Sequence, residues 1–254
     1  MKRDREDGQG GNDDDHQGEA IRFWERHYRA PERRWSGNPN AVLVDIASSM
    51  SPGTALDLGC GEGADAIWLA ALGWRVTAAD VSATALGRAF AGAADAGVTS
   101  RVGFQQHDLA RTFPPGRFDL VSAQYLHSPV EFPRDRVLQR AARAVAPGGL
   151  LLVVGHGSAR PWGSNPDPHA RFPTPDGTLA AIELKPEWWD IEISASPERQ
   201  ASGPGGQSAT VVDVVTAARR RVAARPVEAR PDQSVRRHPG ADPVDGRTRD
   251  ARAP

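Results

Sequence analysis

Short apolar runs alternate with segments of helical periodicity through the middle of the chain. Apolar runs that end in polar or glycine residues occupy positions 54–59, 74–80, 101–108, 118–124 and 150–156. Between them, residues 64–72, 83–97 and 134–149 carry apolar residues at the spacing that is typical of helices. Because the runs are too apolar for half-exposed strands, the alternation predicts an α/β protein with a mostly parallel sheet and helices on both faces.

The pattern is less regular after residue 156. Residues 177–184 are expected to form a short helix, and 188–200 and 208–221 a final pair of strands, with a turn in the glycine-rich segment between them. With these two strands, the expected sheet has seven strands.

The two ends of the chain differ from its middle. Residues 1–19 are charged and glycine-rich, and residues 223–254 mix Arg, Pro and Asp with almost no residues to bury. Both segments are expected to be disordered tails. Residues 20–222 therefore form the single expected domain.

Composition narrows the class of protein. The formal net charge is -1, so no global field favours a nucleic-acid partner. Cys60 is the single cysteine, which excludes a disulfide within the chain. The N-terminus has no apolar core of a secretory signal, and no apolar run is long enough to span a membrane. We expect a soluble cytoplasmic protein with no membrane partner.

Three glycines follow the first apolar run, in DLGCGEGADAIWLAALG (57–73). A turn from a parallel strand into a helix lies at the carboxyl edge of the sheet, where open α/β proteins bind ligands. Gly59, Gly61 and Gly63 let the backbone approach a ligand closely, since they carry no Cβ. Asp57 and Glu62 would repel a pyrophosphate, so this G-x-G-x-G turn suits a ligand with an ammonium and a sulfonium better than a dinucleotide.

Two more carboxylates end the next two strands. Asp80 lies about twenty residues beyond the glycines, where a carboxylate can accept hydrogen bonds from ribose hydroxyls. Asp108 follows the third strand, with Leu109 beside it, at a position from which an adenine edge can be read. Together with the glycine turn, these positions predict a nucleoside-containing ligand.

In these motifs the chain resembles the class I S-adenosylmethionine-dependent methyltransferases. The likeness covers residues 54–156, the expected cofactor-binding core, and extends more loosely from 21 to 220. LDLGCGEG (56–63) is similar to the family's first motif, and FWERHYRAPERRWSGNPN (23–40) resembles the small-molecule branch that includes tellurite-resistance methyltransferases. The resemblance implies a Rossmann-like, doubly wound fold, S-adenosylmethionine as cofactor, and in-line methyl transfer to a small-molecule acceptor.

The resemblance also implies which residues hold the cofactor. The turn would contact the methionine part through its backbone, Asp80 would bind the ribose with Val81 against the adenine, and Gln124 would lie near the methionine part. The N-terminal segment would fold over the ligand. The expected cofactor-binding residues are Trp24, Tyr28, Trp35, Asp57, Gly59, Cys60, Gly61, Gly63, Asp80, Val81, Asp108, Leu109 and Gln124.

Catalytic candidates lie at the ends of the fourth and fifth strands. Tyr125, His127 and His156 reach the same sheet edge, where a general base would take a proton from the acceptor. The alternative is that these side chains only shape the pocket, because the donor is already activated and alignment alone can suffice. No histidine or acidic cluster has the spacing of a metal site, so no metal is expected.

Two other functions stay open from the sequence. A non-catalytic, regulatory S-adenosylmethionine-binding protein would keep the glycines and Asp80 but lack an open acceptor cavity. A nicotinamide-dependent oxidoreductase is disfavoured by the G-x-G-x-G spacing and by the acidic turn. Neither the acceptor nor the oligomeric state can be read from the pattern.

Overall fold

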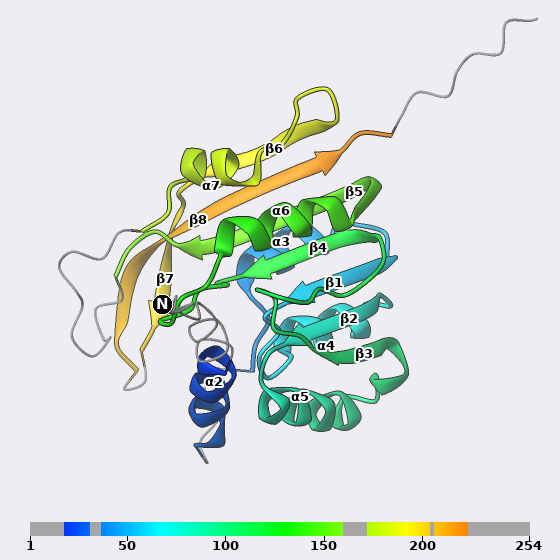
Figure 1. Cartoon of the computed structure of the whole chain (residues 1–254), viewed down its shortest axis with the longest axis vertical. Helices are drawn as coiled ribbons and strands as arrows, with labels where there is room; N and C mark the ends of the chain where they lie inside the picture. Colours follow the sequence, from blue (N-terminus) through cyan, green and yellow to red (C-terminus); the bar gives the residue numbers. More distant parts are fainter. Residues whose placement is uncertain (1–17, 31–36, 160–171, 204–205, 223–254) are drawn as a thin grey trace, which may run out of the picture. The chain divides into compact units, whose positions relative to one another are not determined.

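The structure is a computed structural model and describes residues 18–30, 37–159, 172–203 and 206–222 (Figure 1). The expected C-terminal tail (223–254) and residues 1–17 of the expected N-terminal tail lie outside these ranges. Gly18 forms a turn, and helix α2 (Glu19–Arg29) begins directly after it.

The described residues form one mixed sheet of eight strands in the order β3-β2-β1-β4-β5-β8-β6, with β7 paired to β8 beside this path. The seven expected strands make the continuous path, and β7 is the additional strand. Strands β1 to β5 are parallel, and β8 runs antiparallel to β5, β6 and β7. The strands are β1 (Thr54–Leu58), β2 (Arg75–Asp80), β3 (Val102–Gln106), β4 (Phe118–Gln124), β5 (Val145–His156), β6 (Trp189–Ala195), β7 (Glu198–Ser202) and β8 (Ser208–Arg220).

Helices cover both faces of the sheet, as the apolar strands predicted. Side chains alternate between the faces along a strand. On β5, Leu152 and Val154 pack in one core with α3 and α4, and Leu151 and Val153 pack in the other with α6 and α7. The helices are α3 (Ala41–Ala47), α4 (Ala64–Ala71), α5 (Ala83–Asp95), η1 (Thr99–Arg101), α6 (Arg134–Ala144) and α7 (Pro175–Ile182). The expected Rossmann-like fold is confirmed.

The boundary between α6 and β5 differs from the sequence expectation. The Pro-Gly-Gly segment was expected to stop the helix ahead of a strand at residue 150, but the helix ends at Ala144 and β5 begins at Val145. The register between β4 and β5 shifts here, from Phe118–Val145 to Leu120–Leu150. A Cβ on Gly149 would lie 2.9 Å from the Phe118 carbonyl oxygen, so this irregular strand needs a glycine.

Candidate active site

The glycine turn joins β1 to α4 in a conformation that requires glycine. Gly59 has a φ of 72°, and Gly63, the N-cap of α4, has a φ of 83°. A Cβ on Gly63 would lie 2.7 Å from the Cβ of Ala89, and one on Gly59 would lie 2.7 Å from Leu126. The backbone therefore passes close to α5 and to the loop after β4, and it borders a cavity at the carboxyl ends of the strands.

The cavity has a volume of about 1260 Å³. It brings together residues from α2, the glycine turn, the ends of β2 to β5, and β7. Trp35 lies outside the described residues; every other site residue expected from the sequence lines the cavity, namely Trp24, Tyr28, Asp57, Gly59, Cys60, Gly61, Gly63, Asp80, Val81, Asp108, Leu109, Gln124, Tyr125, His127 and His156.

Three buried carboxylates surround the turn. Asp80 accepts hydrogen bonds from the backbone N–H groups of Gly61 and Ser82, each at 2.9 Å. Burial raises the pKa of Asp57 well above its ordinary value, and the charges of Asp65 and Asp80 raise it further. Burial also raises the pKa values of Asp65 and Asp80. Positive charge in the cavity would therefore stabilise the ionised forms.

One atom of this group has no partner among the described residues. Asp57 is 2% exposed, and its Oδ2 accepts no hydrogen bond there. A buried acceptor without a partner is costly unless a ligand or water satisfies it. Asp57 therefore offers an unused acceptor at the cavity wall.

Two elements from the N-terminal part dock onto the turn and α5. Asn40 donates to both carboxylate oxygens of Asp65, from its backbone N–H and its side-chain amide, each at 2.7 Å. Glu25 on α2 accepts from the Thr84 hydroxyl at 2.6 Å and from the Thr84 N–H at 3.2 Å, at the first turn of α5. These contacts place Trp24 and Tyr28 along the cavity.

Arg88 connects the end of α2 to the glycine turn. Arg88 on α5 pairs with the buried Glu62 of the glycine turn at 2.7 Å and donates to the Ala30 carbonyl at 2.6 Å. Glu62 therefore has an internal counter-charge, whereas the three carboxylates above accept hydrogen bonds from backbone N–H groups and an amide. The sequence interpretation that both Asp57 and Glu62 favour a cationic ligand thus rests on Asp57.

The remaining expected residues take separate parts of the wall. Asp108 and Leu109 follow β3, where Asp108 accepts from the Ala110 N–H at 3.1 Å. Gln124 ends β4 and donates to Ser122 at 3.0 Å, while its buried Oε1 has no partner in the described structure. Burial raises the pKa of the Cys60 thiol well above its ordinary value, which leaves the thiol protonated and weakly nucleophilic.

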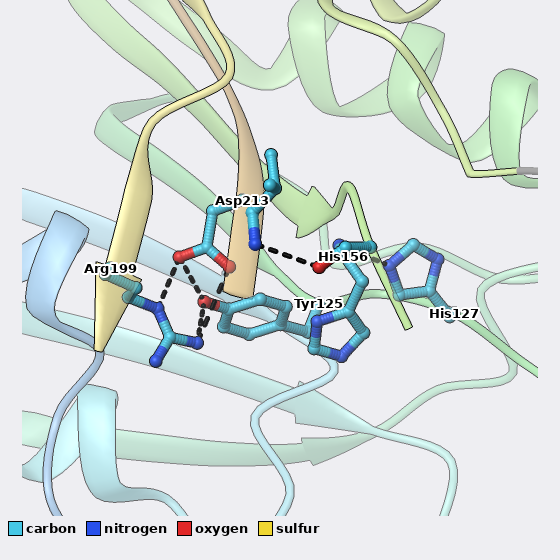
Figure 2. A network of polar contacts seen from close by, with 7 residues as sticks. Tyr125, His127, His156, Arg199 and Asp213 are labelled. Carbon is cyan, nitrogen blue, oxygen red and sulfur yellow. Dashed lines mark hydrogen bonds and ion pairs between the residues drawn. The ribbon is translucent and has the colours of Figure 1, made fainter. Parts of the chain in front are cut away.

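Tyr125, His156 and His127 form an aromatic stack at the ends of β4 and β5 (Figure 2). The Tyr125 and His156 rings lie 4.4 Å apart, and the His156 and His127 rings 5.5 Å apart. The backbone N–H of His156 donates to Nε2 of His127 at 3.3 Å. Burial, with a smaller effect of Arg134, lowers the pKa of His127 to about 4. His127 is therefore neutral near pH 7, with its Nε2 lone pair in use.

Two residues of this region had no sequence signal. Arg199 on β7 and Asp213 on β8 form an ion pair at 2.6 Å, and Asp213 is 1% exposed. Tyr125 donates its hydroxyl to Asp213 at 3.0 Å and accepts from Arg199 at 3.1 Å (Figure 2). Burial, assisted by the charge of Asp213, raises the pKa of Tyr125 to about 12. Arg199 also lines the cavity.

Neither a metal site nor a membrane span emerges from the described ranges. No three His, Cys, Asp or Glu side chains within them converge to hold a metal ion. No helix in the same ranges is sufficiently long and apolar to cross a membrane.

Comparisons with known proteins point to one family. A family model described as a methyltransferase domain matches residues 55–149. The chain is 32% identical over 197 residues to 2-heptyl-1-hydroxyquinolin-4(1H)-one methyltransferase of Mycobacteroides abscessus. The alignment covers 73% of this chain and 84% of that protein.

Solved structures support the fold. One, described as concerning the conversion of a disulfide bond into a thioacetal group during echinomycin biosynthesis, matches with a TM-score of 0.63 and 26% identity, over 80% of this chain and 94% of that one. TehB from Haemophilus influenzae matches with a TM-score of 0.58 and 17% identity, over 72% of this chain and 62% of that one.

Proposed function

Because the chain belongs to the class I S-adenosylmethionine-dependent methyltransferases, we propose that it transfers a methyl group to a small-molecule acceptor. The observation that carries this proposal is the cavity that joins the acidic glycine turn to the Tyr125–His156 stack. The relative that is 32% identical is named for a small-molecule substrate, which supports the acceptor class.

The residues of the turn fit S-adenosylmethionine. Asp57, with its unused buried oxygen, would accept from the ammonium group, and Asp80 would accept from the ribose hydroxyls. Asp108 and Leu109 lie two strands away, where they would meet the adenine. Trp24 and Tyr28 would cover the ligand from α2.

The bound cofactor supplies a methyl group already activated by its sulfonium. The protein then has to align the acceptor and exclude water, which can supply much of the rate enhancement. Of the three catalytic candidates, His127 is the least suited to act as a base, because its pKa is about 4 and its Nε2 accepts from the His156 backbone. His156 is the one we propose as a base for acceptors that carry a proton.

The proposal is tested by ligand binding and methyl transfer with the full chain. We expect calorimetric titration to detect S-adenosylmethionine and S-adenosylhomocysteine but not NAD. Radiolabelled methyl transfer is then measured to a panel of phenols, N-hydroxy heterocycles, amines and thiols, with ribosomal RNA as a macromolecular comparison.

Each outcome separates the alternatives. Transfer to a small molecule supports the proposal, and transfer to the RNA alone contradicts the acceptor class. Adenosyl ligand binding without transfer to any acceptor favours the non-catalytic alternative. Binding of NAD alone would favour the oxidoreductase reading.

A further inference from the structure

We infer that Arg199 binds the reacting oxygen of the acceptor, and that the acceptors are small molecules whose hydroxyl group ionises readily. This inference rests on the proposed function and adds the class of acceptor to it. Nucleophilic attack by such an oxygen forms a C–O bond as the C–S bond breaks. The acceptor anion becomes a neutral ether and the cofactor leaves as a neutral sulfide, so no proton remains to be removed.

Charge is unevenly distributed around the cavity. The carboxylates that line it come from the end of β1, the glycine turn, the start of α4, and the ends of β2 and β3. Arg199 comes from β7, and is the single Arg or Lys among the described residues that line the cavity. In the sheet order, β1 and β2 lie on one side of β4, whereas β5 and β8, which pairs with β7, lie on the other. Asp213 already pairs with this guanidinium, so the Arg199 end is the least negative part of the cavity wall, and it suits an anionic group better than the glycine turn does.

The guanidinium is held in place from behind. Its Nε donates to Oδ2 of Asp213 at 2.6 Å, and its Nη2 donates to the Tyr125 hydroxyl at 3.1 Å. Asp213 is buried, so it cannot move away to solvent, and Tyr125 contacts both partners. This arrangement fixes the plane of the guanidinium at little further entropic cost when a ligand binds.

One end of the guanidinium stays available. Within the described structure, Nη1 of Arg199 has no hydrogen-bond partner, and Figure 2 shows it turned away from both Asp213 and Tyr125. The Arg199 side chain is 31% exposed, although Asp213 behind it is 1% exposed. An oxygen anion in the cavity would meet the Nη1 donors before the Asp213 charge. A hydrogen bond of this charged kind is about twice as strong as a neutral one.

Binding of paired probes to the full chain tests the inference. The probes are 2-heptyl-1-hydroxyquinolin-4(1H)-one, the same quinolone without its N-hydroxyl, and acidic phenols paired with their hydroxyl-free analogues. Calorimetry measures each against protein saturated with S-adenosylhomocysteine. We expect the parent protein to prefer at least one hydroxylated probe by about tenfold, and Arg199→Gln to reduce this preference to less than about threefold.

Three further variants test whether a loss of preference in Arg199→Gln comes from the lost contact or from damage to the fold. Arg199→Lys keeps the charge but not the planar fork, and should retain part of the preference. Arg199→Gln combined with Asp213→Asn removes the buried charge that the single change leaves unpaired, and should also lose the preference. Arg221→Gln removes a guanidinium from an exposed ion pair with Asp190, outside the cavity, and should keep it in full.

Cofactor binding decides between two roles for Arg199. Affinities for S-adenosylhomocysteine and for 5′-methylthioadenosine, which lacks the amino acid, should be unchanged in Arg199→Gln. Loss of the first alone would mean that Arg199 binds the cofactor carboxylate, and would overturn the inference. So would a hydroxyl preference that survives in Arg199→Gln, or no preference in the parent protein. Methyl transfer to any other small molecule would still uphold the proposed function in those cases.

Discussion

At the scale of single residues, the buried carboxylates in and beside the cavity differ in what holds them. Glu62 and Asp213 have arginine partners, whereas Asp80 is bonded by two backbone N–H groups and Asp57 keeps an unused oxygen. A buried carboxylate without a counter-ion is costly in the free protein. This cost is reduced when a cation binds, and we therefore propose that Asp57 and Asp80 serve recognition more than stability.

Asp80→Ala should weaken S-adenosylhomocysteine binding by at least about tenfold, or about 1.4 kcal/mol. The change removes the proposed acceptor of the ribose hydroxyls and the acceptor that orients the Gly61 N–H. Calorimetry measures the effect, with thermal unfolding as a check on folding. Asp190→Ala, in an exposed ion pair away from the cavity, is the control. Unchanged affinity in Asp80→Ala would remove this residue from the binding site.

At the scale of elements, polar contacts from Glu25 attach α2 to the first turn of α5. Partial burial raises the pKa of Glu25, but hydrogen bonds from Thr84, Ala83 and Ser82 together outweigh burial and hold the pKa below its ordinary value. The α5 helix keeps its own cap, because the Ser82 hydroxyl accepts from the Ala85 N–H at 3.1 Å. Removing Glu25 therefore affects α2 more than α5.

Glu25→Ala should increase amide hydrogen exchange in residues 19–29 by about tenfold, the effect of losing roughly 1.4 kcal/mol of charge-assisted hydrogen bonding. Affinity for S-adenosylhomocysteine should fall, because Trp24 and Tyr28 lose their fixed position. Asp95→Ala, which removes an exposed carboxylate at the end of α5, serves as the control. Equal exchange in both variants would show that α2 is held by other contacts.

Sequence patterns predicted elements best where burial is complete. Strands such as β4 and β5 are covered on both faces, so their apolar runs were continuous and easily located. The expected strand 188–200 instead divides into β6 and β7, because exposed residues such as Glu192 and Glu198 do not show where a strand bends.

The residues of the candidate site also differ in how well the sequence predicts them. The expected cofactor positions are close together in the sequence or end a strand, so a linear pattern can predict them. The Tyr125–Arg199–Asp213 contacts join residues 74 and 88 positions apart, and they exist through the antiparallel register of β7 and β8. Nothing in the local sequence encodes that register, so both partners of Tyr125 were missed.

At the scale of the whole molecule, the buried acidic groups link stability to pH. A carboxyl whose pKa is raised on folding binds more protons in the folded state than in the unfolded state. Its contribution to stability therefore falls as pH rises above the ordinary value of 3.8, until the raised pKa is passed. His127 acts in the opposite sense between about 4 and 6.5, because its pKa is lowered.

Asp57→Asn should stabilise the ligand-free protein relative to the parent, by roughly 1 kcal/mol near pH 7. This advantage should grow as pH rises from about 4, since Asp57 is the group removed and the effect of His127 cancels in the difference. Urea unfolding of both proteins from pH 4.5 to 8 measures it. A difference that does not vary with pH would mean that Asp57 has an ordinary pKa.

Tyr125 also limits which sequences this fold can accept. Its φ of 50° lies in the left-handed region, where glycine and asparagine are tolerated but β-branched residues are strongly strained. A residue at position 125 must therefore meet two requirements: it must tolerate the left-handed backbone conformation, and it must contact Asp213 and Arg199. Glycine and asparagine meet the first requirement but lack the hydroxyl contact, whereas valine and isoleucine do not meet the first. When specificity for a new acceptor evolves, substitutions are thus expected at the neighbours of Tyr125 before Tyr125 itself is replaced.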